Sequence, residues 1–305
     1  MASGSLWRRL HHCLPPIVRW PLKAAFVALV VLLALYPRLD LLAANLRHWS
    51  DLNALIDPHD PRLAALEREV EARAAESDSD AKLHAHVERV VYRAIPYAFD
   101  WETWGVMDYL PTLSQVLDQG REDCDGRAVV AASLLRRMGC DAGLATDLKH
   151  VWVVTPTGEL MGPGAGAKTM IADETGTRVV LSADTLANLG RGLAFGIAVF
   201  PLERELLIVL ALWLALLHPW SNAWRRWVGG GLLLAALLLL RAAGASTDAL
   251  AHSPALLWGG VGVALVGVLV VALRRRGARE SRPGAPCAEG GRSTCGPSSP
   301  RTQLP

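Results

Sequence analysis

The fold of the central region is decided by one stretch, Gly120-Arg-Glu-Asp-Cys124-Asp-Gly-Arg-Ala-Val-Val-Ala-Ala-Ser-Leu-Leu-Arg-Arg-Met-Gly139. Its apolar and small residues recur at helical spacing, which predicts a helix with one buried face. Asp123 is the expected N-cap, and Gly139 ends the helix after two arginines. Cys124 then lies in the first turn, where unpaired backbone N–H groups and the helix dipole favour a thiolate. The acidic neighbours oppose this, because nearby negative charge raises the pKa of a thiol.

Short strands are expected downstream of this helix. The run Asp147-Leu-Lys-His150-Val-Trp-Val-Val154 predicts a strand that ends at a turn over residues 155–158. Further strands are expected at residues 158–161, 169–173 and 178–181. The pattern therefore predicts an α+β class, in which a helix that carries a cysteine packs on an antiparallel sheet that carries a histidine. A thiol and an imidazole are groups that nucleophilic acyl transfer requires.

The two motifs, in this order, resemble those of the transglutaminase-like cysteine-peptidase superfamily. That family opens its helix with Gly-x-Cys-x-(Asp/Tyr)-x-Ala and has a His-Ala-Trp strand, and this chain has Cys124 between Gly120 and Ala128, followed by His150-Val-Trp-Val-Val154. The resemblance covers roughly residues 85–185. It implies a transglutaminase-like (papain-like) domain with Cys124 as nucleophile and His150 as general base.

The chain departs from the family pattern at three positions. Glu122 replaces the glycine before the cysteine, Gly126 replaces the Asp or Tyr after it, and Gly162 stands where the family places its orienting carboxylate. The nearest substitute is Asp173, one strand later, which would hold the imidazole tautomer and stabilise its charged form. Glu159 is a weaker candidate. If the triad is incomplete, the alternative is a catalytically inactive binding or sensor module on the same fold.

Each of these residues also has a simpler explanation. A single cysteine at a helix start is usually a small packing residue, and a strand histidine is usually a satisfied polar residue; the pair in the family's order favours a site. His84 and His86 are two positions apart on an expected helix and so point to different faces, which argues against a metal site. The chain has no Cys-x-x-Cys motif, no glycine-rich phosphate loop and no basic patch with interleaved aromatics. We therefore expect no metal, no cofactor and no nucleic-acid partner.

The two ends of the chain have the composition of a membrane protein. Hydrophobic residues make up 51% of the chain and charged residues only 20%. Four apolar segments predict about four transmembrane helices: 22–36, 206–217, 228–240 and 255–273. The first three need flanking residues to reach the length of about 20 residues that a membrane-spanning helix requires. Basic clusters precede the first segment, separate the second from the third and follow the fourth, so with four spans they all face one side, as the positive-inside rule expects.

This topology divides the chain into four parts. We expect a cytoplasmic N-terminus with the first transmembrane helix (1–37), an extracytoplasmic transglutaminase-like domain (38–192), three further transmembrane helices (193–274) and a disordered cytoplasmic tail (275–305). Cys124 and Cys140 share the outer domain, where a helix of about 15 residues would hold them roughly 22 Å apart, beyond disulfide reach. Both are therefore expected to be free thiols.

The sequence thus predicts a multi-pass cell-membrane protein of a bacterial type. Its expected activity is that of a cysteine peptidase or amidase, with thiol acyl transfer from a peptide or protein amide. Transfer to water would make it a hydrolase, and transfer to an amine would make a cross-link. The membrane is the other expected partner, and no protein partner is specified by the sequence.

Overall fold

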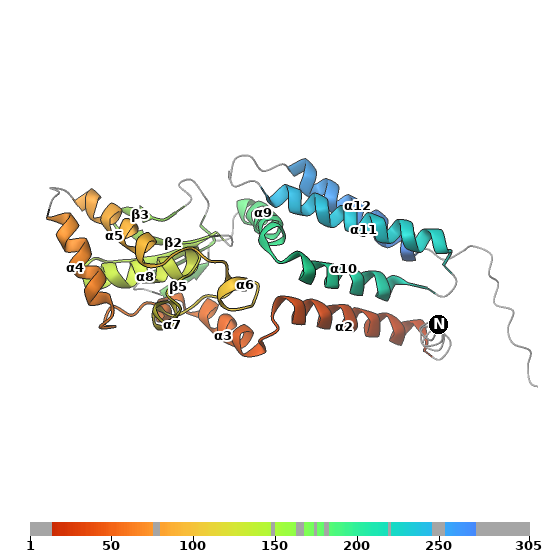
Figure 1. The fold of residues 1–305 in the computed structure, drawn as a ribbon, viewed down its shortest axis with the longest axis horizontal. Coiled ribbons are helices and arrows are strands. Elements are labelled where there is room, and N and C mark those ends of the chain that lie inside the picture. The colour runs from red at the N-terminus through yellow and green to blue at the C-terminus, as the bar shows by residue number, and fades with distance from the viewer. Residues whose placement is uncertain are drawn as a thin grey trace, which may run out of the picture.

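The computed structural model describes residues 14–75, 80–147, 150–162, 168–173, 176–179, 183–218, 221–245 and 254–272. It has two parts, a region of helices and sheet and a set of long apolar helices beside it (Figure 1). We call the first the α/β region, and it runs from α3 to β5. The second is the helix bundle, which consists of α2, α10, α11 and α12. The expected class, helices with an antiparallel sheet, is confirmed.

The α/β region opens with a series of helices that surround the cysteine helix. In chain order these are α3 (Leu39–Ser50), the 3-10 turn η1 (Leu52–Leu55), α4 (Leu63–Ala74), α5 (Asp80–Ala94), α6 (Asp100–Thr103), α7 (Leu113–Gln119) and α8 (Cys124–Arg137). The expected N-cap of α8 is confirmed, because the Asp123 side chain accepts a hydrogen bond from the Asp125 N–H at 3.0 Å. Nearly all of α8 is buried, so it forms the centre of the core.

Five short strands form one antiparallel sheet in the order β3-β2-β1-β4-β5. The strands are β1 (Gly143–Thr146), β2 (Val151–Thr155), β3 (Gly158–Leu160), β4 (Met170–Asp173) and β5 (Gly176–Val179). Helix α8 packs on β1 and β2, and α5 packs on α8 and β3. The cysteine helix therefore lies against the strand that follows the histidine.

The single strand expected over residues 147–154 is wrong at its start. Strand β1 ends at Thr146, and the chain reverses before β2 begins at Val151. The Asp147 carboxylate accepts a hydrogen bond from the His150 N–H at 2.8 Å, which is how an aspartate side chain stabilises a turn. His150 therefore lies at the end of the sheet, next to the turn, and not within a strand.

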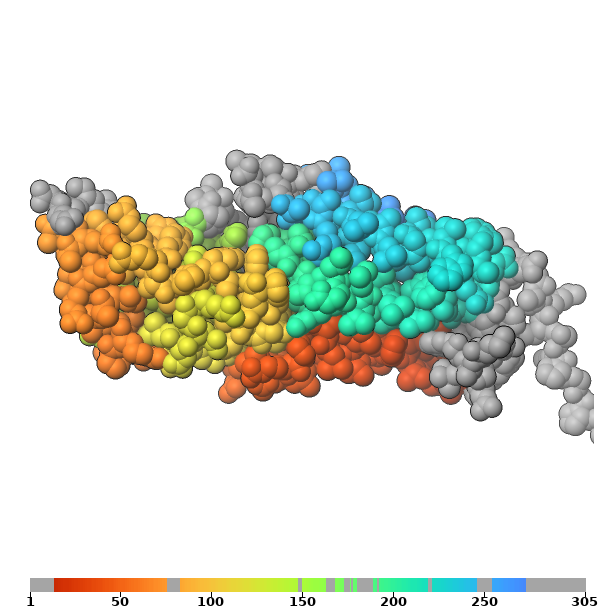
Figure 2. Space-filling view, in the orientation of Figure 1, coloured from red at the N-terminus to blue at the C-terminus, as the bar shows by residue number. Residues whose placement is uncertain are grey.

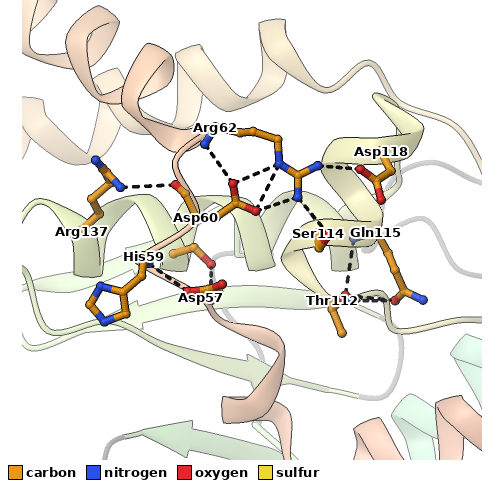
Figure 3. Close-up of polar contacts among 10 residues, drawn as sticks. Asp57, His59, Asp60, Arg62, Thr112, Ser114, Gln115, Asp118 and Arg137 are labelled. Carbon is orange, nitrogen blue, oxygen red and sulfur yellow. Dashed lines mark hydrogen bonds and ion pairs between the residues drawn. The ribbon is translucent and has the colours of Figure 1, made fainter.

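A polar network fixes the helices around α8. The Arg62 guanidinium donates to both oxygens of Asp60, to Asp118 at 2.6 Å and to the Ser114 hydroxyl at 2.9 Å (Figure 3). Arg137, at the end of α8, donates to the Asp60 carbonyl at 3.3 Å. The start of α4 is thus tied to both α7 and α8.

Three helices are long and apolar enough to cross a membrane: α2 (Pro16–Leu35), α11 (Ala223–Gly244) and α12 (Pro254–Ala272). The remaining expected span, 206–217, corresponds to α10 (Leu202–Leu216), which has 15 residues and a length of about 22 Å, short of a hydrocarbon core of about 30 Å. Helix α10 ends just before His218, which precedes a proline and is therefore disfavoured in a helix.

Helix α10 runs antiparallel along α2. Near one end of the pair, Lys23 donates to the Leu217 carbonyl at 3.2 Å, and near the other end Arg204 donates to the Gly105 carbonyl at 2.8 Å. The bundle and the α/β region together form one elongated body (Figure 2), with the N-terminal end of α2 far from the sheet (Figure 1).

Helix α9 (Ala183–Val199) connects the two parts. A Cβ atom at Gly244 would lie 1.9 Å from the Ala194 carbonyl oxygen, so only glycine permits this approach between α11 and α9. At the same end of α11, Arg241 donates to the Ile197 and Phe200 carbonyls at 3.0 and 2.9 Å. Helix α9 is therefore held on the bundle at the side that faces the α/β region (Figure 1).

Candidate active site

Cys124 is the first residue of α8, as the sequence predicts. The backbone N–H of Val151 is hydrogen-bonded to its sulfur, so the start of β2 lies against the thiol. Because His150 directly precedes Val151, the chain also carries the predicted base to this place. The turn at Asp147 and the packing of α8 on β2 together set this approach.

Cys124 and His150 line one cavity of about 370 Å³. Its polar wall is formed by Asp100, Asp108, Asp123, Cys124, Asp125 and His150. Its apolar wall comes largely from α9 and the residue after it, with Leu193, Phe195, Gly196, Val199 and Phe200 among the lining residues. The His150 and Phe195 rings have centroids 6.5 Å apart. The structure therefore brings the predicted nucleophile and base to one pocket, and α9 closes one side of it.

The surroundings of the sulfur favour the thiol over the thiolate. Burial raises the pKa of Cys124 well above its usual value, and the charges of Asp125 and Asp123 raise it further, while the Val151 N–H lowers it. The thiol donates a hydrogen bond to Asp125 at 3.2 Å. Cys124 is thus protonated at neutral pH, and it needs a base in the reaction itself to become a nucleophile.

Carboxyl groups dominate the same wall. Burial raises the pKa of Asp100 and Asp125 well above the usual range, and neighbouring negative charges raise both further. Burial likewise raises the pKa of Asp108, whereas hydrogen bonds from Asn45 and Trp49 lower it.

Two more carboxyl groups lie just before α8. Burial raises the pKa of Glu122 to about 8 and that of Asp123 to about 7. Glu122 is completely buried and accepts a hydrogen bond from the Trp104 indole N–H. Five carboxyl groups with raised pKa values therefore surround the start of α8.

Two of the departures from the family pattern compensate each other. A Cβ atom at Gly126 would lie 2.0 Å from Cγ and 2.8 Å from Cβ of Glu122. The side chain of Glu122 thus occupies the space that a larger residue at position 126 would need. Glycine at position 126 therefore leaves room for the buried carboxyl group at position 122.

The structure does not bring Asp173 to His150. Thr146 pairs with Val151 on one side and with Met170 on the other. His150 precedes Val151 and therefore lies one residue beyond the level of Thr146, toward the turn. Asp173 lies three residues from the same level, away from the turn. The two residues are thus four residues apart, or about 13 Å along the strands. Strand β1 also lies between them. The side chain of Asp173 is outside the described part of the chain.

The structure also shows the surroundings of the two other positions considered for an orienting carboxylate, 159 and 162. Glu159 pairs with Val154 in the sheet and forms an ion pair with Lys168 at 2.6 Å. Gly162 follows β3, and a Cβ atom there would lie 3.1 Å from the Trp152 ring. Little space is therefore left for a side chain at the position where the family has its carboxylate.

Sequence reasoning missed part of the site. Asp100 is the first residue of α6 and Asp108 lies in the loop between α6 and α7, and their approach to α8 depends on tertiary packing. The sequence shows the acidic run around Cys124, but from the sequence alone it predicts only an influence on the pKa of the thiol. Three aromatic residues next to Asp100 also line the pocket: Tyr97, Phe99 and Trp101. Both Cys124 and Cys140 are free, as expected.

Comparisons with protein-family models, with curated proteins and with solved structures find no match to this chain. The resemblance to the transglutaminase-like superfamily therefore stays a prediction from the two motifs.

Proposed function

We propose that the protein is a membrane-anchored thiol acyltransferase of the transglutaminase-like kind, acting as a cysteine peptidase or amidase. Cys124 is its nucleophile and His150 its general base. The observation that carries the proposal is that the two side chains line one cavity, although 25 residues separate them in the sequence. The hydrogen bond from the Val151 N–H to the sulfur supports the same juxtaposition.

The chemistry follows from the protonated thiol. His150 takes the thiol proton while the sulfur attacks the carbonyl carbon of a peptide or protein amide. The C–N bond breaks, and His150 returns the proton to the leaving amine. Water then attacks the thioester to give a carboxylate and the free thiol, while an amine in place of water would give a cross-link. Hydrolysis is the simpler outcome.

The bundle supports a multi-pass topology with the α/β region outside the cytoplasm. Lys23 and Arg226 lie at one end of the bundle, where Lys23 contacts Leu217 and Arg226 contacts the His218 carbonyl. Arg241 lies at the opposite end, near Phe200. Because basic residues favour the cytoplasmic side, the end of the bundle that carries Lys23 and Arg226 faces the cytoplasm. The α/β region, at the other end, faces away from it. Helix α10 then returns along α2 and is a short membrane crossing, the second of four along the chain.

Topology is testable with single cysteines at exposed positions in a cysteine-free background. Ala72→Cys lies on α4 and Ala223→Cys at the start of α11. An impermeant maleimide added to intact cells should label the first and not the second. Equal labelling of both, or labelling of the second alone, contradicts this orientation.

The catalytic proposal is tested on the full chain in detergent with a peptide acyloxymethyl ketone, which alkylates thiols activated by a neighbouring imidazole. Peptide mapping should find Cys124 labelled at least tenfold faster than Cys140, with labelling of Cys124 lost in Cys124→Ser. His150→Ala should reduce the rate for Cys124 at least tenfold and leave Cys140 unchanged. A His150→Ala variant that folds and reacts at the wild-type rate would refute the role of His150.

A second candidate, an inactive binding or sensor module, is favoured by two observations. Gly162 stands where the family places its carboxylate and the sheet register places Asp173 away from the level of His150, and burial and the acidic neighbours raise the pKa of the thiol. In that case the probe labels Cys124 no faster than Cys140, and His150→Ala has no effect on either rate.

A further inference from the structure

The cavity that holds Cys124 lies at the end of the first apolar helix. Helix α2 ends at Leu35, whose carbonyl accepts a hydrogen bond from the Met107 N–H at 2.9 Å. The next residue, Tyr36, donates its hydroxyl to the Asp108 carbonyl at 3.0 Å. Tyr36, Met107 and Asp108 all line the cavity. One wall of the cavity is therefore fixed to the point where this candidate membrane span ends.

Helix α9 separates the cavity from the two other candidate spans, and Figure 1 shows it between the α/β region and the bundle. On one face of α9, a Cβ atom at Gly190 would lie 3.6 Å from the Leu257 side chain of α12, and the Ala194 carbonyl lies against Gly244 at the end of α11. Val199, on the opposite face, lines the cavity. Because a helix with its side chains is about 10–12 Å across, the cavity begins about one helix diameter beyond the ends of α11 and α12.

The lengths of these two spans give the depth of the cavity. Helix α11 has 22 residues and α12 has 19, so they are about 33 and 29 Å long and match a hydrocarbon core of about 30 Å. The headgroups add about 5–8 Å on each side of that core. With α11 and α12 across the membrane, the cavity therefore opens at the membrane surface and not far above it in water.

The side chains at the mouth of the cavity suit an apolar ligand. Leu189 and Leu193 line the cavity and are still 55% and 54% exposed. They lie four residues apart, so they are neighbours on one face of α9. Single exposed leucines are common on protein surfaces, whereas apolar side chains grouped at a cavity mark a binding site. An apolar side chain of a substrate therefore fits against this face of α9.

The charges of the polar wall argue against a phospholipid as the occupant. Four aspartates line the cavity, and no lysine or arginine is among its described lining residues: Asp100, Asp108, Asp123 and Asp125. The phosphate of a lipid headgroup would meet acidic side chains alone, and like charges repel. A peptide backbone carries no net charge and avoids this repulsion. The cavity thus favours a peptide that lies at the membrane surface over the lipid itself.

We infer that the substrate of Cys124 is a membrane-anchored peptide, cleaved at an amide directly beside its anchor and with an apolar side chain against α9. This inference rests on the proposed function and names the substrate class for it. The sulfur forms a thioester with the peptide carbonyl, the C–N bond breaks, and the leaving amine takes the proton from His150 before water releases the carboxylate. An anchor that stays in the lipid also raises the effective concentration of the amide at the cavity.

The reactive test uses the full chain in lipid nanodiscs and three dileucyl acyloxymethyl ketones. The first has a palmitoyl chain directly on the dipeptide, the second has the same chain on a long Gly-Ser spacer, and the third has an acetyl group. The directly anchored probe should label Cys124 at least tenfold faster than the acetyl probe and severalfold faster than the spacer probe. Cys140, which follows the other end of α8, should not show this order.

Matched changes test the apolar wall. Leu193→Gln should slow the labelling of Cys124 by the directly anchored probe severalfold. Leu46→Gln changes a leucine on α3 that is 65% exposed and is not among the lining residues, and it should leave the rate unchanged. Glutamate in place of the leucine beside the ketone should also slow the labelling at least tenfold, because its carboxylate would face the aspartates.

Binding is measured separately on Cys124→Ser, which does not react with the ketone at this position. A palmitoyl dipeptide amide with a photoreactive leucine is cross-linked to this variant in nanodiscs, and the adducts are mapped by mass spectrometry. Adducts should form on the segment 189–199 of α9 and should disappear with an excess of the same peptide without the photoreactive group.

The two experiments separate the possible failures. Competed adducts on α9 without labelling of Cys124 by any ketone would refute the catalytic role and leave a binding site for anchored peptides. Equal labelling of Cys124 by the acetyl and the directly anchored probes, or labelling by the spacer probe alone, would overturn the inference and leave the catalytic role intact. Absence of competed adducts on α9 also overturns it. Adducts that disappear when phosphatidylglycerol is added to the nanodiscs would assign the cavity to the lipid instead.

Discussion

Gly126→Ala is expected to destabilise the protein, although the same change stabilises most helices. Position 126 is the third residue of α8, where alanine is ordinarily favoured over glycine by about 1 kcal/mol. Here the new methyl group would lie 2.0 Å from Cγ of Glu122 and 2.9 Å from Cγ2 of Val116. Carbon atoms in contact are normally about 3.5–4.0 Å apart, so Glu122 must move.

The expected size follows from what Glu122 would lose. Its side chain is fully buried and accepts the Trp104 N–H, so displacing it combines overpacking, which costs about 1–3 kcal/mol, with a weakened buried hydrogen bond, which costs about 1–3 kcal/mol. After the helix gain of about 1 kcal/mol is subtracted, the net loss is about 1–5 kcal/mol. In a protein of this size that lowers the melting temperature by several degrees.

The decisive experiment is a double-mutant cycle on the full chain in detergent, followed by thermal unfolding with tryptophan fluorescence. Glu122→Gly removes both Glu122 carbons that the new methyl group would meet, and only the contact with Val116 remains. The double variant Glu122→Gly with Gly126→Ala should melt higher than the sum of the single changes allows, with a coupling of at least about 1 kcal/mol. If Gly126→Ala raises the melting temperature, or if the two changes are additive, the two positions do not share space as described.

Three further predictions concern the support of the site. Gly244→Leu should displace α9 and speed the reaction of Cys124 with a bulky maleimide severalfold, while Cys140 is unaffected; an unchanged rate means that α9 does not restrict access. Arg62→Met should lower the melting temperature by several degrees, since the buried Asp60 carboxylate loses its ion pair and keeps only the hydrogen bond from the backbone N–H of residue 62, a loss of about 1–3 kcal/mol; Arg68→Met, on α4, is the control. The free energy of unfolding should fall as pH rises from about 5 to 8, by up to about 1.4 kcal/mol per pH unit and group. The reason is that folding raises the pKa of Glu122 to about 8, so the folded protein holds this proton more tightly than the unfolded chain. Glu122→Gln should flatten the melting temperature over this range, and a wild-type curve that is already flat contradicts the assignment.

The cysteine helix could be predicted from the sequence because its signals are local. The N-cap, the apolar spacing and the arginines before Gly139 all lie within one stretch, and the helix begins and ends where they indicate. The hairpin before β2 was missed because β1, with the sequence Gly-Leu-Ala-Thr, has too weak a strand pattern to be separated from its neighbour. The displacement of Asp173 from His150 follows from that hairpin, since β1 intervenes between their strands.

The acidic cluster and the wall formed by α9 were beyond local reasoning. Asp100 approaches Glu122 through the loop over residues 96–98, whose Pro96 carbonyl and Ala98 N–H pair with the Glu122 backbone. No spacing in the sequence encodes that pairing. The position of α9 depends on Gly244, which lies about 50 residues away along the chain and was one of many small residues in an apolar segment.

The wall that α9 contributes has a practical consequence for anyone who wishes to study this chemistry in isolation. A water-soluble fragment cut before Ala183 would retain the sulfur and the imidazole but would expose them in an open trench without Phe195 and its neighbours. Reactivity measured on such a fragment would describe a different chemical environment from that of the intact molecule. A ligand of the pocket must fit between the α/β region and α9, which is held on the helix bundle. The selectivity of the pocket therefore depends on both parts of the intact protein.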